Sequence, residues 1–285
     1  MLSRLWTQSA CLVAITVALA TGDPAFAADP DDRPGPPLAA TVQPPPQADP
    51  DFLFGRPRAF YGIYGGWLLA SQRGGVFDFT REHLTVDEGA FDSALIRFAF
   101  GLALAARADL LFEVGVSQAT VQSEDREYLD DNYTPFDPSD DRPIAQTTQF
   151  KQLPIGASVR YWLRPRGREV GRYAWVPHRV APYVGIGGGT QRYRFTQEGD
   201  FVDSLGMIYS DVLHSKGWAA SGHAFGGTSI KLTRRVFAGA EARYVWADTP
   251  LSHNYLSFCR YASSTCSDSI DLSGLRITGG IEFVF

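Results

Sequence analysis

The sequence predicts an all-β protein, an eight-stranded antiparallel up-and-down transmembrane β-barrel. Three observations indicate this fold: an export signal at the start, eight segments in which apolar residues recur at every second position, and a final segment that ends on Phe285. The chain has 285 residues, of which 45% are hydrophobic and 20% charged, a composition that excludes a disordered protein. A formal net charge of -5 offers no basic surface for a nucleic-acid backbone, so no nucleic-acid partner is expected.

Residues 1–27 predict a cleaved secretory signal peptide. Arg4 provides the positive start, residues 10–20 form a short apolar stretch, and residues 25–27 read Ala-Phe-Ala, which is typical of a cleavage site. The apolar stretch falls well short of the roughly 20 residues that a membrane-spanning helix needs. The mature chain is therefore expected to begin at Ala28.

Residues 28–57 predict a Pro-rich disordered periplasmic linker. They hold nine of the 18 prolines and five aspartates, with almost no apolar periodicity. A partner-binding arm is the alternative. The barrel domain is then expected to cover residues 58–285.

Two cysteines, Cys259 and Cys266, remain after removal of the signal peptide. An even pair in an exported chain favours a local disulfide. Metal ligation is the alternative, but the single nearby His253 does not complete a four-ligand site, so no metal or other cofactor is predicted.

Eight segments with a period of two residues predict the barrel strands. The segments are about 58–71, 92–104, 109–122, 146–163, 180–196, 215–232, 236–248 and 269–285. In the last segment the odd positions from Leu275 to Phe285 are apolar or Gly, whereas Arg276, Thr278 and Glu282 occupy even positions. In 180–196, Val184 and Ile186 are out of phase with Tyr193 and Phe195, which predicts a bulge at residues 187–189.

The two faces of these strands indicate which one meets lipid. The polar face consists mostly of Gly, Ala and Ser with one or two charges per strand, which suits a crowded interior better than a water-facing exterior. The bulky apolar residues exceed what the narrow interior of an eight-stranded barrel can hold, so they are expected to point outward. An Arg on the lipid face would cost about 2–4 kcal/mol at the midplane, and Arg97, Arg160, Arg243 and Arg276 all lie on the other face.

Aromatic residues and connection lengths predict the orientation. Two interfacial girdles are expected, formed by Tyr61, Tyr161, Phe283 and Phe285 near one end and by Tyr193, Phe195, Trp218, Tyr244 and Trp246 near the other. With periplasmic N- and C-termini, the long connections 72–91, 123–145, 197–214 and 249–268 would be outer loops, and 105–108 and 233–235 short inner turns. The Arg-rich inner turn 164–179 has no explanation at this level.

The C-terminal sequence GGIEFVF, preceded by apolar residues at every second position, resembles the closing signature of Gram-negative outer-membrane barrels. Residues 58–285 as a whole resemble the small eight-stranded group that includes OmpA/OmpX-type and OmpW-like proteins. The resemblance implies an outer-membrane location in contact with lipid and lipopolysaccharide. It also implies an insertion signal, read by the barrel-insertion machinery, at Ile277, Ile281, Phe283 and Phe285.

The inward face predicts a salt-bridged plug in the lumen, because charges in a narrow interior need partners. Its expected members are Arg97, Glu113, Arg160, His223, Lys231, Glu241, Arg243, Arg276 and Glu282. These side chains are read as structural filling, and a gated conduction path is the alternative.

The sequence favours a non-enzymatic barrel whose long outer loops serve envelope integrity or surface interaction, with an unknown loop partner. A narrow channel for small or apolar solutes and a lipid A deacylase are the alternatives. The His-x-Ser pairing of the deacylase family is missing, because none of the five histidines is followed two residues later by Ser. Eight acidic residues within 124–141 could hold Ca²⁺, but their spacing differs from an EF-hand, and a solvated loop is favoured.

Overall fold

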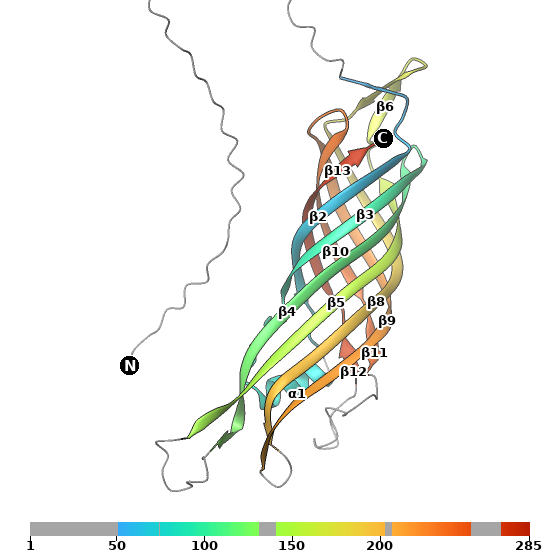
Figure 1. The fold of residues 1–285 in the computed structure, drawn as a ribbon. Coiled ribbons are helices and arrows are strands. Elements are labelled where there is room, and N and C mark those ends of the chain that lie inside the picture. Colours follow the sequence, from blue (N-terminus) through green and yellow to red (C-terminus); the bar gives the residue numbers. More distant parts are fainter. Residues whose placement is uncertain (1–50, 74, 131–140, 203–206, 252–268) are drawn as a thin grey trace, which may run out of the picture. The chain divides into compact units, whose positions relative to one another are not determined.

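The computed structural model describes residues 51–73, 75–130, 141–202, 207–251 and 269–285. The predicted signal peptide, most of the predicted linker, Cys259 and Cys266 lie outside these residues. Eight antiparallel strands close into a barrel in the order β10-β13-β2-β3-β4-β5-β8-β9 (Figure 1). They are β2 (Ala59–Ala70), β3 (Ser93–Ala105), β4 (Ala108–Asp130), β5 (Arg142–Trp162), β8 (Val180–Val202), β9 (Ile208–Lys231), β10 (Val236–Trp246) and β13 (Gly274–Val284). Each strand pairs with the next along the chain and β13 pairs with β2, so the predicted up-and-down barrel is confirmed.

Four strands in the middle of the chain are longer than their apolar pattern predicts. β4, β5, β8 and β9 have 21 to 24 residues, and their pairing continues through polar positions such as Gln122↔Thr147 and Thr196↔His214. The connections 123–145 and 197–214 are therefore in large part extensions of two hairpins. The apolar alternation is expected only where a strand contacts lipid. Backbone hydrogen bonds between two strands need only a partner strand, so the strands can continue beyond the apolar pattern.

The two ends of the barrel differ in how the strands are joined. At one end, which we call the short-turn end, lie the turns that follow β3 and β9, the segment 163–179, and Phe285. At the other, which we call the long-loop end, lie helix α1 (Gly75–His83) and strands β11 (Asp248–Pro250) and β12 (Ser269–Asp271). Figure 1 shows β6 and the C-terminus at the first end, and α1, β11 and β12 at the second.

A three-stranded sheet lies at the short-turn end. It consists of β1 (Leu53–Phe54), β7 (Ala174–Pro177) and β6 (Gly167–Val170), so the Arg-rich turn contains a hairpin and the end of the predicted linker is a strand. Leu53 pairs with Trp175, and both side chains are buried against Phe60 and Phe237 of the barrel. This apolar contact explains why Leu53 departs from the polar composition of the residues before it.

Helix α1 closes the long-loop end of the lumen. The predicted outer loop 72–91 contains this helix, whose buried Val76 and Phe77 join an apolar cluster with Phe150 of β5 and Phe195 of β8. Phe77 makes edge contacts with Phe150 and Phe195, at ring-centroid distances of 5.5 and 6.1 Å. Within the described residues, no helix has the length and apolar character to cross a membrane.

The predicted bulge in β8 is wrong. β8 pairs with β5 and with β9 in continuous register from one end to the other. Tyr193 and Phe195 point into the lumen and are at most 1% exposed, whereas Ile186 points outward and is 70% exposed. These two aromatic residues therefore do not belong to the predicted outer girdle: α1 provides an apolar surface inside the barrel for them to pack against.

Many other bulky apolar side chains lie on the outside of the barrel. Residues such as Trp67, Phe98, Phe112 and Ile277 are about half exposed on a face that contains no buried charge. On the opposite parity of the same strands lie the buried charged side chains. Apolar residues outside and charges inside are the reverse of a water-soluble barrel.

Candidate functional site

The interior of the barrel is the candidate site, and Glu113 lies at its centre. Glu113 of β4 accepts hydrogen bonds from Arg97 of β3 and, through both its oxygens, from Arg243 of β10 at 2.6 and 2.8 Å. The three residues are inward because each occupies the parity opposite to the outward apolar residues of its strand. A two-pronged contact of this kind fixes both the position and the plane of a guanidinium.

Glu241 completes a four-membered charge cluster with these residues. Its Oε1 lies 3.1 Å from Arg97 Nη2 and 3.0 Å from Arg243 Nε, and its Oε2 accepts a hydrogen bond from the Tyr183 hydroxyl at 3.2 Å. Two arginines and two glutamates thus compensate one another, with every side chain at most 6% exposed. Breaking one member would leave an uncompensated buried charge, which is far more costly than losing a surface pair.

Ser158 and His223 lie next to this cluster and form a close contact. The Ser158 hydroxyl oxygen lies 2.7 Å from His223 Nε2, and the hydroxyl donates to Glu113 Oε2 at 2.8 Å. In a serine–histidine–acid triad the carboxylate holds the other ring nitrogen, whereas here Glu113 lies 3.9 Å from the same Nε2. The geometry of these three residues therefore differs from that of a serine–histidine–acid triad.

A second cluster surrounds Arg160 toward the short-turn end. Arg160 pairs with Asp109 at 3.0 Å and with Glu282 at 2.6 Å, and Trp162 Nε1 donates to Asp109 at 2.8 Å. The guanidinium also lies 4.3 Å from the centroid of the Trp162 ring and 4.4 Å from that of Phe60. Arg160 is fully buried, and ionic and aromatic partners together replace its lost hydration.

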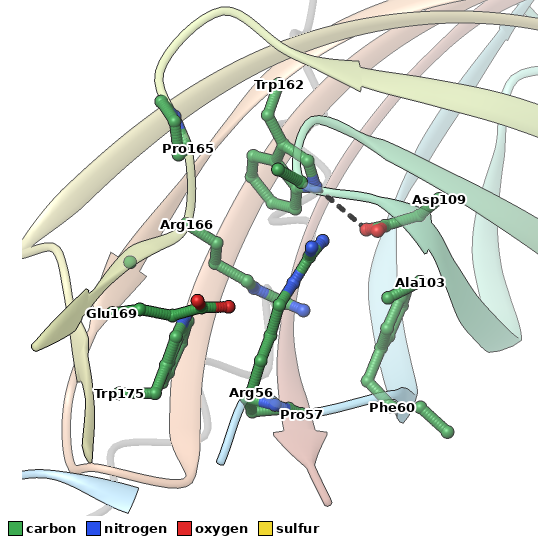
Figure 2. Close-up of a pocket in the computed structure, with 13 residues that line it drawn as sticks. Arg56, Pro57, Phe60, Ala103, Asp109, Trp162, Pro165, Arg166, Glu169 and Trp175 are labelled. Carbon is green, nitrogen blue, oxygen red and sulfur yellow. Dashed lines mark hydrogen bonds between the residues drawn. The ribbon is translucent and has the colours of Figure 1, made fainter. Parts of the chain in front are cut away.

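Arg166 enters this second cluster from outside the barrel strands. It extends from the segment between β5 and β6 and pairs with Glu282, which also accepts a hydrogen bond from the Tyr64 hydroxyl. Burial and the neighbouring Arg160 lower the pKa of Arg166 to about 9, so the guanidinium stays protonated at neutral pH. The Arg-rich turn therefore closes the short-turn end by inserting one of its arginines into the lumen (Figure 2).

Arg276 is buried but differs from the other lumen arginines. Its Nη2 donates to Gln191 Oε1 at 3.1 Å, and no carboxylate among the described residues forms an ion pair with it. Its direct neighbour across the β10–β13 pair is Arg243, a like charge. Arg276 contributes positive charge to the lumen without joining either cluster.

Lys231, which the sequence assigns to the lumen network, does not join it. Lys231 is the last residue of β9 at the short-turn end, and its ammonium pairs with the exposed Asp51. Lys231 lies on the inward face of β9, but its position at the end of the strand lets the long side chain reach the segment before β1.

The residues of the predicted insertion signal lie on the outer face of β13. Ile277, Ile281 and Phe285 are 43 to 60% exposed, and the ring of Phe283 stacks on Tyr61 of β2 at a centroid distance of 5.0 Å. These four residues form one continuous apolar stripe, as the period of two requires.

The lumen also contains charged and polar residues that are not among those predicted from the sequence. Asp109 lies on the same face of β4 as Glu113, and Ser158 lies on the same face of β5 as Arg160. The alternating pattern could therefore have identified Asp109 and Ser158 as lumen residues. Arg166 carried no such signal, because it lies outside any strand and its direction depends on the path of the turn. The acidic segment 124–141, for which the sequence favours a solvated loop over Ca²⁺ binding, lies partly outside the described residues. The described part of the chain contains no cluster of three or more potential metal ligands.

Among solved structures, the chain is similar to small outer-membrane β-barrel proteins. OprG of Pseudomonas aeruginosa is 15% identical, with a TM-score of 0.43 over 82% of this chain and 99% of OprG. Neisserial surface protein A is 14% identical, with a TM-score of 0.36 over 80% of this chain and 96% of that protein. Ail of Yersinia pestis is 9% identical, with a TM-score of 0.36 over 80% of this chain and all of Ail. No protein-family model matches the sequence, and no curated protein is significantly similar to it.

Proposed function

We propose that this protein is a non-enzymatic outer-membrane β-barrel with a closed lumen, serving envelope integrity or surface interaction. The observation that carries the proposal is the division of its faces: about half-exposed aromatic and aliphatic side chains outside, and buried ion pairs inside. Such a surface is compatible with hydrocarbon and incompatible with water at this scale. Lipid, together with lipopolysaccharide in the outer leaflet, is then its immediate environment.

The closed lumen favours a structural role over conduction. Three obstacles follow one another along the barrel: the Arg160 cluster, the Glu113 cluster, and the apolar cluster around α1. An ion crossing the lumen would have to separate paired charges and then traverse an apolar layer, and both steps are costly. Recognition would then fall to the long-loop end, which contains the two projecting hairpins.

Electrical recording in planar bilayers tests the closed lumen. The purified mature chain should insert without producing a steady open level, whereas a persistent large conductance would support the narrow-channel alternative. Heat-modifiable gel mobility of the same sample verifies that the inserted protein is a folded barrel.

The proposed lack of enzymatic activity has its own test. Lipid A from cells that contain the protein should have the same mass spectrum as lipid A from cells that lack it. A species lighter by one acyl chain would contradict the proposal and favour the deacylase reading.

A further inference from the structure

The short-turn end contains a cavity that the proposed function does not explain. Its volume is about 270 Å³, and it lies between the barrel mouth, the segment before β2, and the β6–β7 hairpin. Figure 2 shows side chains from all three parts extending toward it, among them Arg56, Trp162, Arg166, Glu169 and Trp175. Since drug-sized ligands occupy pockets of roughly 300–1,000 Å³, this cavity suits a smaller solute.

Two charged groups that line the cavity lack an ionic partner within the described part of the chain. The Arg56 guanidinium donates to the carbonyl of Ala105, which leaves its charge uncompensated. Glu169 of β6 lines the same cavity, and its carboxylate has neither a hydrogen bond nor an ion pair with a described residue. Most of the buried charges in the lumen are ion-paired, whereas the partly buried Arg56 and the exposed Glu169 face the same cavity without an ionic partner among the described residues.

Arg166 provides a further unsatisfied donor beside the cavity. One of its terminal nitrogens is occupied by Glu282, but its Nε is buried and donates to nothing among the described residues. A buried donor without an acceptor is unfavourable, and the same residue lines the cavity. Arg56 and Arg166 are thus suited to share an anionic group, and Glu169 to accept an ammonium.

The other walls of the cavity are apolar. Phe60, Trp162 and Trp175 line it, and Trp175 is only 3% exposed because the β6–β7 hairpin packs it against the barrel. Aromatic faces accommodate both a short carbon stem and an ammonium group.

We propose that this cavity binds a small zwitterion, whose anionic oxygen group contacts Arg56 and Arg166 and whose ammonium contacts Glu169. Two sources share this chemistry: a free amino acid in the compartment at the short-turn end, and the phosphoethanolamine headgroup of a phospholipid. The inference goes beyond the proposed function, because it concerns a cavity outside the ion-paired part of the lumen and is independent of conduction.

Calorimetric titration of the detergent-solubilised mature chain tests the site, with intrinsic tryptophan fluorescence as a second signal. The probes are L-alanine, phosphoethanolamine, and the singly charged propionate and ethylamine. At least one zwitterion should bind about tenfold or more tightly than either singly charged probe, because only a zwitterion satisfies both charges. Which of the two zwitterions binds identifies the source.

Variants locate the binding. Glu169→Gln and Arg56→Gln should each weaken zwitterion binding at least about tenfold. Arg168→Gln, an exposed change in the same strand that does not line the cavity, should leave it unchanged. Heat-modifiable mobility confirms that each variant is folded. The proposal is overturned if neither zwitterion binds, if propionate or ethylamine binds equally well, or if the two cavity variants bind like the parent.

Discussion

At the scale of single residues, Glu113 holds the interior together, because one carboxylate compensates two buried arginines and accepts from Ser158. Glu113→Gln keeps the shape of the side chain but removes its charge. We expect it to lower the free energy of unfolding by about 3–5 kcal/mol, since Arg97 and Arg243 would then share only Glu241. Urea unfolding of the protein in phospholipid vesicles measures this difference.

Arg276→Gln is the matched control for Glu113→Gln. Both changes remove one buried charge, but Arg276 gives up a single hydrogen bond to Gln191 and leaves no carboxylate unpaired among the described residues. We expect a cost of at most about 1 kcal/mol, and relief of the Arg243–Arg276 repulsion would reduce it further. Equal losses for the two variants would show that pairing does not govern stability here.

Gly187 is constrained by the close approach of neighbouring atoms and not by a bulge in β8. A Cβ atom at this position would lie 2.5 Å from His223 Nε2 and 2.6 Å from Ser158 Oγ. Gly187→Ala should therefore separate these two side chains and destabilise the protein by about 1–3 kcal/mol in the same unfolding measurement. Gly222→Ala is the control, because nothing lies within 4 Å of its Cβ position, and a similar loss there would contradict the steric explanation.

At the scale of elements, α1 acts as a stopper that depends on side-chain packing rather than on the barrel ladder. Phe77 is 1% exposed and contacts Phe91, Phe150 and Phe195. Phe77→Ala should reduce the local stability of α1 by about 3–5 kcal/mol while the strands keep their hydrogen bonds. Hydrogen exchange should then accelerate at the amides of 75–83 and stay unchanged at those of β2 and β13.

Phe79→Ala is the control for Phe77→Ala, because it makes the same change in helix propensity without removing a side chain from the apolar cluster. Phe79 is only partly buried and its ring contacts His83 of the same helix, at a centroid distance of 4.5 Å. Its removal should change exchange in α1 far less than removal of Phe77. Comparable acceleration in both variants would mean that α1 does not depend on the apolar cluster.

The elements also show which parts of the structure a one-dimensional pattern can predict. Alternation identified all eight barrel strands and most lumen charges, because a strand has only two faces and a misplaced Arg in lipid is costly. It failed for Tyr193 and Phe195, since aromatic residues suit both a lipid interface and an interior filled by α1. It could not place Arg166 or α1 either, because their positions depend on chain segments folding back onto the barrel.

At the scale of the whole molecule, charge is distributed unequally between the two ends. The short-turn end has many arginines, whereas the described residues of the long-loop end are mainly acidic. The arginines include Arg56, Arg58, Arg107, Arg164, Arg166, Arg168, Arg172, Arg179, Arg234 and Arg235; the acids include Asp78, Glu82, Asp87, Glu88, Glu124, Asp125, Glu127, Glu198, Asp200 and Asp211. The orientation of the barrel in the membrane therefore decides which compartment faces the basic end and which faces the acidic end.

Cysteine labelling with a membrane-impermeant maleimide determines that orientation. If the long-loop end faces the medium, Glu88→Cys should be labelled on intact cells, whereas Arg168→Cys should be labelled only after permeabilisation; both positions are exposed. The parent chain, which retains Cys259 and Cys266, gives the background for each condition. The opposite labelling pattern would place the acidic end in the periplasm, and the projecting hairpins could then not take part in surface interaction.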